Sequence, residues 1–328
     1  MSDTATLNRL FGSIEADLRL VDRAFEEATA TDMDMLASAV VHVLGSQGKR
    51  LRMALALLTG KLIDYRFDKL LPMSVALEMV HLATLVHDDV VDAAQTRRGL
   101  PTVNALFGNN IAILLGDYLF AKTAGLVAQV EDFRIDRLFS ETVARVCEGT
   151  IMEMLSVRKV DLSVPNYIDR VGRKTAVLMS ACCKGGAIVA GGTDAQIALM
   201  ERYGMNLGIA FQVIDDVLDY TGTEVSIGKP AGNDLRQGLM TLPLIYALQV
   251  DQDGRLDQVR QLMRQEEPDE DILKDVIAWV NTGSGGDEAL DLARHYAARA
   301  RAALAEFDPS PERTVLEELI EFVLARSR

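Results

Sequence analysis

Two short acidic segments, "DDVVD" at 88–92 and "DDVLD" at 215–219, lie inside runs that are otherwise almost entirely apolar. On a helix, residues four apart share a face, so the first and last aspartates of each segment point the same way, and the second lies about 100° round the axis. Ionised carboxylates are costly to bury alone, and oxygen ligands suit the hard cation Mg²⁺. The pattern therefore predicts metal ligands beside a phosphate-bearing substrate: Asp88, Asp89, Asp92, Asp215, Asp216 and Asp219.

The other interpretation of each segment is a solvated helix end whose acids have no function. The dipole of a helix disfavours carboxylates at its C-terminus, and two copies of D-D-x-x-D on apolar helices make this interpretation the weaker one. A calcium-binding EF-hand is excluded, because its spaced loop ligands and central glycine are missing.

Basic and polar residues that can bind diphosphate accompany both segments. "TRRGLPT" follows the first segment, and the glycine-rich "SIGKPAGND" follows the second. Arginine binds phosphate through its planar fork. Each of these residues alone is more typical of a surface charge or a core histidine, but together they bring positive charge to both acidic segments. The candidates are Lys49, Arg52, His81, Arg97, Arg98, Lys174, Thr175, Gln212 and Lys229.

The composition narrows the class of protein. The chain has 328 residues, with 34 Lys and Arg against 48 Asp and Glu, and a net charge of −14. This balance argues against nucleic-acid binding, which depends on Lys and Arg. We find no apolar core of a secretory signal and no uncharged run of the ~18–20 residues that a transmembrane helix needs. We therefore expect a cytoplasmic protein with reduced cysteines.

Helical periodicity dominates the chain, with glycine- and proline-containing breaks between segments and without alternating strands. We expect one all-α domain over 1–328, with N-caps at Thr193 or Asp194 and at Ser310. The helices around 75–92 and 203–220 are apolar on nearly all sides, so they are expected to be buried and to line a cavity that opens at their acidic ends. The predicted helices span 4–29, 33–45, 50–62, 68–93, 103–129, 134–158, 165–191, 194–220, 240–249, 256–264, 269–281, 287–306 and 311–326.

At this point the motifs resemble a known family. "GKRLR", "HLATLVHDDVVD", "RRGLPTVN", "GDYLF", "KTA", "FQVIDDVLD" and "GKPAGNDLRQGLMTLPLIYAL" are similar, in order, to the trans-isoprenyl diphosphate synthases, or polyprenyl synthetases. The likeness runs from about residue 45 to about residue 250, and "ATLVHDDVVD" resembles the long-chain, octaprenyl-type members.

The resemblance implies the all-α isoprenoid synthase fold, a bundle of roughly ten or more helices around a central apolar cavity, in a homodimer. It implies condensation of an allylic diphosphate with isopentenyl diphosphate by ionisation, condensation and elimination, with roughly three Mg²⁺ ions per active site. The resemblance also implies transient membrane contact during release of the product. Carried over by motif, the six aspartates hold Mg²⁺, and Lys174 and Lys229 join them in catalysis. Arg97, Lys174, Thr175, Gln212 and Lys229 bind the allylic diphosphate, and Lys49, Arg52, His81 and Arg98 bind isopentenyl diphosphate.

The chain departs from the family pattern at three positions. Leu239 replaces a frequent lysine in G-K-x-T-L-P, which removes one basic contact near the second segment. Thr150 and Glu153 replace the Glu and Gln of G-E-x-x-Q, on a helix that the resemblance places along the chain-binding tunnel. None of these three positions lies in the two acidic segments, so we still expect activity.

Residues below the first segment bear on product length. A helical turn of ~5.4 Å is close to the length of an isoprene unit. Ala83 and Thr84, about one turn before Asp88, are small where short-chain members carry aromatic plugs, and Met79 and Val80 are the next candidates for a floor. We therefore expect an all-trans product of C30 or longer, with C20 geranylgeranyl diphosphate as the alternative.

Two further alternatives concern the reaction itself. A class I terpene cyclase has a different second metal motif, rich in Asn, Ser or Thr and Glu, whereas this chain repeats D-D-x-x-D. A non-catalytic synthase subunit commonly loses an acidic segment, and both are intact here.

Overall fold

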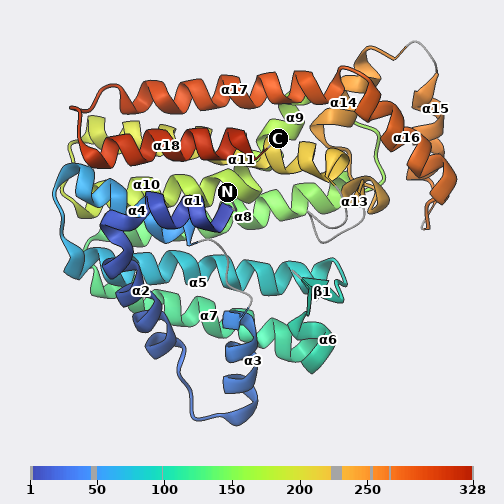
Figure 1. The fold of residues 1–328 in the computed structure, drawn as a ribbon. Coiled ribbons are helices and arrows are strands. Elements are labelled where there is room, and N and C mark those ends of the chain that lie inside the picture. Colours follow the sequence, from blue (N-terminus) through green and yellow to red (C-terminus); the bar gives the residue numbers. More distant parts are fainter. Residues whose placement is uncertain are drawn as a thin grey trace. The chain divides into compact units, whose positions relative to one another are not determined.

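A computed structural model describes residues 3–45, 50–97, 99–222, 231–251, 254–265 and 267–326 (Figure 1). Three candidate residues, Lys49, Arg98 and Lys229, lie outside the described residues. Within the described part the regular secondary structure is helical apart from one two-stranded antiparallel hairpin, β1 (Thr96–Arg97) and β2 (Leu100–Pro101). The all-α prediction is therefore confirmed.

The chain divides into two compact units that alternate along the sequence. The first unit comprises Met1–Ala144, Leu178–Gly204 and Ala303–Leu319, and the second comprises Arg145–Val177, Met205–Ala302 and Ile320–Arg328. The expectation of a single domain over 1–328 stays a prediction.

In the first unit, helix α5 (Phe67–Val91) is the centre of the packing. It contacts α7 along its length, as Figure 1 shows, and also α4 and α2. Every residue from Pro72 to Val80 is buried, as expected for a helix that is apolar all round. The other elements are α1 (Asp3–Leu10), η1 (Gly12–Ile14), α2 (Glu15–Thr29), α3 (Asp34–Gly45), α4 (Leu51–Ile63), α6 (Val103–Phe107) and α7 (Asn109–Gln129), with parts of α8 (Phe133–Ser156), α10 (Val177–Val189), α11 (Asp194–Thr221), α17 (Gly285–Leu304) and α18 (Pro311–Ala325).

The second unit contains the remaining parts of α8, α11, α17 and α18. Gly285 lies close to the backbone of α14: a Cβ added to it would meet the Pro243 carbonyl oxygen at 2.3 Å, so only glycine fits. Asp269 caps α16 by accepting hydrogen bonds from the N–H groups of Asp271 and Ile272. The unit also holds α9 (Val164–Val171), η2 (Gly172–Ala176), α13 (Asn233–Arg236), α14 (Leu242–Gln249), α15 (Arg255–Met263) and α16 (Glu270–Thr282).

The structure corrects three predicted helices. The segment predicted over 4–29 breaks after Leu10, and that over 103–129 breaks at Gly108, where φ is +82°. The segment over 165–191 contains a π-helical turn at 172–176. The expected absence of strands was also wrong for 96–101, where Gly99 with φ +79° allows the hairpin turn. The N-caps at Thr193 and Ser310 are confirmed, since their hydroxyls accept from Gln196 and Arg313 N–H.

Two helices of the described chain, α5 and α7, have the length and apolar composition of membrane spans. Such a pair is a weak indication, because core helices of soluble proteins pass the same test. In the most apolar window of α5, 72% of the residues are buried inside the protein, against 39% for α7. The burial of α5 is that of a core helix.

Candidate active site

The first acidic segment ends helix α5. Asp88 and Asp89 lie in its last turn, and Asp92 is the C-cap, whose backbone N–H donates to the Asp88 carbonyl. His81, Thr84 and Asp88 are partly exposed at a spacing of three and four, whereas Leu82, Ala83 and Val86 between them are buried. They therefore share an accessible face of α5 that leads to the acids.

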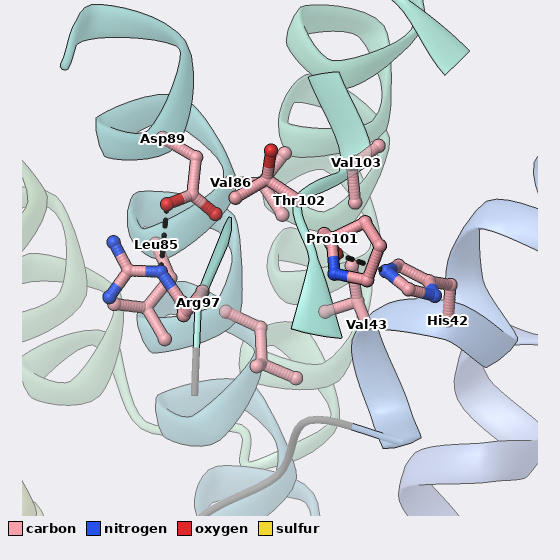
Figure 2. Close-up of a pocket in the computed structure, with 10 residues that line it drawn as sticks. His42, Val43, Leu85, Val86, Asp89, Arg97, Pro101, Thr102 and Val103 are labelled. Carbon is pink, nitrogen blue, oxygen red and sulfur yellow. Dashed lines mark hydrogen bonds and ion pairs between the residues drawn. The ribbon is translucent and has the colours of Figure 1, made fainter. Parts of the chain in front are cut away.

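Asp89 points away from that face and is 5% exposed. Its Oδ1 accepts a hydrogen bond of 2.8 Å from Arg97 Nε, as Figure 2 shows. The hairpin makes this contact, because the turn at Gly99 folds β1 and β2 back beside the end of α5. Asp89 and Arg97 also border a small pocket of about 20 Å³, with His42 and Pro101 on its far wall. The arginine predicted to bind the allylic diphosphate is thus paired with the middle aspartate.

The second acidic segment lies in the last two turns of α11. Asp215 and Asp219 are partly exposed, whereas Asp216 is 3% exposed. Tyr167 OH donates to Asp216 Oδ2 at 2.6 Å, and Gln212 Nε2 donates to Oδ1 at 2.8 Å. Thr175 Oγ1 in turn donates to Gln212 Oε1 at 3.0 Å. Two predicted diphosphate ligands, Thr175 and Gln212, therefore form one hydrogen-bonded chain with the middle aspartate.

Burial sets the protonation of Asp216. Removal from water raises its pKa to about 7, against the opposing effects of the Tyr167 and Gln212 hydrogen bonds and the nearby Arg170. Arg170 is itself buried, and it donates to Ser156 Oγ and the Met240 carbonyl. The buried position also raises the pKa of Tyr167 well above its usual value, so its hydroxyl stays a donor.

Asp219 and Asp215 have partners of other kinds. The Asp219 carboxylate accepts from the backbone N–H groups of Asn233 and Asp234 at 3.2 and 3.1 Å, so it caps the start of α13. Asp215 Oδ1 lies 2.8 Å from Arg326 Nη2.

Lys174 lies on the π-helical turn, a feature that often marks functional sites. Its ammonium group forms an ion pair with Glu153 of α8, and both side chains are 22% exposed. The backbone there is closely packed, since a Cβ on Gly149 would meet Lys174 N at 2.4 Å and one on Gly208 would meet Ala176 Cα at 2.6 Å. The departure at Glu153 therefore holds the predicted catalytic lysine, and Thr150 is partly buried one turn before it.

The remaining predicted residues differ in accessibility. Arg52 is partly buried in the first turn of α4, and its buried Nε makes no hydrogen bond within the described chain. Leu239 is partly buried, and its N–H donates to the Asp234 carbonyl. Among the chain-length candidates, Ala83 and Met79 are fully buried, Val80 is 1% exposed, and Thr84 lies on the accessible face. Of the described residues, no three of His, Cys, Asp or Glu gather in a ready-made metal cluster.

Sequence reasoning missed three contributors: Tyr167, Arg326, and Glu153 as the partner of Lys174. The first two meet the second acidic segment from distant parts of the chain, so no local spacing points to them. Glu153 departs from the family pattern, and its place one turn after Gly149 on α8 is the available signal.

Comparison with known proteins gives the family. The family model for polyprenyl synthetase matches residues 33–280. The chain belongs to the polyprenyl synthetase family. Heptaprenyl diphosphate synthase component 2 of Geobacillus stearothermophilus is 38% identical over 242 residues, which cover 74% of this chain and 76% of that protein. The predictions of the trans-isoprenyl diphosphate synthase family and of a prenyltransferase are confirmed.

Solved structures of family members have the same fold. A decaprenyl diphosphate synthase from Rhodobacter capsulatus is 30% identical, with a TM-score of 0.92 over 98% of this chain and 99% of that chain. A polyprenyl synthase from Caulobacter crescentus CB15, complexed with calcium and isoprenyl diphosphate, is 32% identical, with a TM-score of 0.92 over 98% of both chains. The predicted isoprenoid synthase fold is confirmed.

Proposed function

We propose that this prenyltransferase condenses an allylic diphosphate with isopentenyl diphosphate, repeatedly, to give an all-trans polyprenyl diphosphate of thirty or more carbons. The observation that carries the proposal is the accessible face of α5, on which Thr84 lies one turn below Asp88 and is small. A bulky residue there would end a chain that grows from the acids toward the N-terminus of the helix. The relatives named for heptaprenyl and decaprenyl products support a long chain over the C20 alternative.

The residues present fit Mg²⁺ as the cofactor. Asp88, Asp215 and Asp219 are partly exposed and Asp92 is exposed, and their carboxylate oxygens are the ligand type that Mg²⁺ prefers. Mg²⁺ keeps several waters and binds one or two carboxylates together with substrate phosphates, so a ready-made protein cage is not required. The relative solved with calcium and isoprenyl diphosphate supports a divalent cation beside diphosphate. When bound, Mg²⁺ supplies Lewis-acid stabilisation of the departing pyrophosphate.

The chain's own residues orient the diphosphates and protect the reaction from water. Lys174, on its π-helical turn, and Arg52, whose Nε has no hydrogen-bond partner within the described chain, bind phosphate oxygens. Thr175 and Gln212 hold Asp216 in place. The buried apolar residues of α5 exclude water from the allylic cation, which the isopentenyl double bond attacks before a proton passes to the released pyrophosphate.

Assembly and location are also part of the proposal. We expect an active homodimer in the cytoplasm, with transient membrane contact as the apolar product leaves. The relative named "component 2" suggests the alternative of a two-component enzyme. The purified chain, active alone and dimeric by light scattering, supports the homodimer, whereas activity only after addition of a second protein supports the two-component enzyme.

The reaction is tested with the purified chain, Mg²⁺, farnesyl diphosphate and isopentenyl diphosphate. Pyrophosphate release that requires isopentenyl diphosphate supports the synthase. Release from farnesyl diphosphate alone would indicate a cyclase, and no release in any mixture would indicate a non-catalytic subunit.

Product length is tested by Thr84→Phe. We expect the main product to fall to C20 or shorter, because the ring blocks the accessible face one turn below Asp88. Thr84→Val, which is close in volume, is the matched control and leaves chain length unchanged. Ala83→Phe lowers the melting temperature instead, because Ala83 is fully buried. Chromatography of the dephosphorylated products decides, and an unchanged product from Thr84→Phe contradicts this path for the chain.

A further inference from the structure

Arg326 contacts the second acidic segment from a part of the chain in which no motif was found. It directly follows α18, and its Nη2 is 2.8 Å from Asp215 Oδ1. Its guanidinium also lies over the ring of Phe211, 4.6 Å from the centroid. Phe211 and Asp215 are one turn apart on α11. The guanidinium of Arg326 therefore contacts both the Asp215 carboxylate and the Phe211 ring of this helix.

The position of Arg326 is set by packing as well as by the ion pair. Ile320, Phe322 and Val323, in the last turns of α18, are each less than 10% exposed. The side chain of Arg326 is 15% exposed and that of Asp215 is 33% exposed, so water screens this pair less than a surface pair. Since arginine stays charged throughout the accessible pH range, Arg326 places a permanent positive charge beside the first aspartate of the segment.

A purely structural contact would link α18 to α11 through any convenient acid. The same unit provides such a contact, because Arg301 of α17 pairs with Glu321 of α18 at the surface. Arg326 instead meets the first of three aspartates that lie within two turns of one helix. Like charges at that spacing repel one another. A cation beside them therefore reduces this repulsion most when no metal is bound.

We propose that Arg326 is the resident counter-ion of Asp215: it neutralises this carboxylate in the ligand-free protein, and Mg²⁺ must displace it. The inference rests on the proposed function, in which Asp215 is a metal ligand. Two cations cannot both make their best contact with the same carboxylate oxygen, so Arg326 and Mg²⁺ bind Asp215 antagonistically. Arg326 thereby weakens metal binding at the second segment.

The test compares Arg326→Met with the wild type and with Arg301→Met, a control that removes a surface arginine of the same unit. Mg²⁺ is titrated calorimetrically into each protein with inorganic pyrophosphate present, at low salt. We expect Arg326→Met to bind Mg²⁺ about two- to fivefold more tightly than the wild type, and Arg301→Met to match the wild type. The gain of Arg326→Met shrinks in about 0.5 M salt, where charges are screened over a few ångströms.

A second measurement separates the counter-ion role from simple packing. Melting temperatures are taken with EDTA and with Mg²⁺ plus pyrophosphate, and we expect the metal to raise the melting temperature more in Arg326→Met than in the wild type. An equal loss of stability in both conditions, with unchanged Mg²⁺ affinity, overturns the inference and leaves the proposed function standing. If the wild type itself gives no Mg²⁺ signal, the proposed metal site fails, and the inference fails with it.

Discussion

The two acidic segments share one sequence pattern and one pattern of burial, yet their middle aspartates have different partners. Asp89 and Asp216 are 5% and 3% exposed, while the first and last aspartates of each segment are more accessible. Asp89 faces a charged arginine, whereas Asp216 accepts from a tyrosine and a glutamine. The same motif therefore holds a carboxylate with a cation in one unit and with neutral donors in the other.

This difference indicates a division of work within D-D-x-x-D. A buried carboxylate that is held by protein partners orients its neighbours, while a more accessible one is available to metal and substrate. The sequence predicts all six aspartates as ligands, which stays a prediction for all six, and the greater accessibility of the outer four favours those four. For Asp89 and Asp216, which are buried, a direct metal contact is the less favoured part of that prediction, and the variants below test it.

The largest expected effect is on the rate. Asp88→Asn and Asp215→Asn should each lower kcat roughly 10²–10³-fold at saturating Mg²⁺, because each loses an anionic ligand at the reacting diphosphate. Asp89→Asn and Asp216→Asn should lower it less, about tenfold, because they disturb only the support of those ligands. Steady-state pyrophosphate release measures all four. Equal losses in the outer and middle variants would mean that the middle aspartates do not play a merely supporting role.

The second effect is on stability, and it separates the two middle aspartates. Arg97→Met removes the charged partner of the buried Asp89 carboxylate and should cost about 2–3 kcal/mol of unfolding free energy. Tyr167→Phe removes one of two donors to Asp216, which can take up a proton instead, and should cost about 1 kcal/mol. Urea unfolding of the metal-free proteins at neutral pH measures both. A larger loss for Tyr167→Phe than for Arg97→Met would mean that the tyrosine stabilises the protein at Asp216 more than the arginine does at Asp89.

A matched substitution controls for the loss of an arginine alone. Arg137 forms an exposed ion pair with Glu141 on α8, so Arg137→Met should change stability little. If it costs as much as Arg97→Met, the effect does not come from the buried carboxylate.

The sequence predicts the helices of both segments well, and the partners of the acids poorly. Apolar periodicity placed α5 at 68–93 against the observed 67–91, and α18 at 311–326 against 311–325. It also placed Asp88 and Asp92 on one face of the helix and Asp89 on another, because successive residues are about 100° apart round the axis. The π-helical turn at Lys174 escaped notice, since one added residue leaves the apolar pattern on both sides intact.

Contacts between distant parts of the chain are the part that periodicity does not contain. Arg97 is eight residues from Asp89, and a hairpin turn at Gly99 explains their contact once it is known. Tyr167 is 49 residues from Asp216, and no spacing rule joins a buried tyrosine to an acid on another helix. The family resemblance supplied roles for Lys174, Thr175 and Gln212, but not the network that links two of them to Asp216.

The smallest expected effect is a dependence of stability on pH that only the second segment should show. The pKa of Asp216 is raised from 3.8 to about 7, so between these values the folded protein holds a proton that the unfolded chain releases. This contribution to stability is complete below about pH 4 and is lost as pH rises through about 7.

Asp216→Asn has no such proton. The melting temperature of the wild type relative to Asp216→Asn, measured with EDTA, should therefore fall from pH 5 to pH 8. Asp169→Asn, at an exposed carboxylate of α9, should keep the wild-type slope. A wild-type advantage that instead grows with pH would mean that Asp216 is held as a carboxylate, and the two segments would then be alike in charge as well as in sequence.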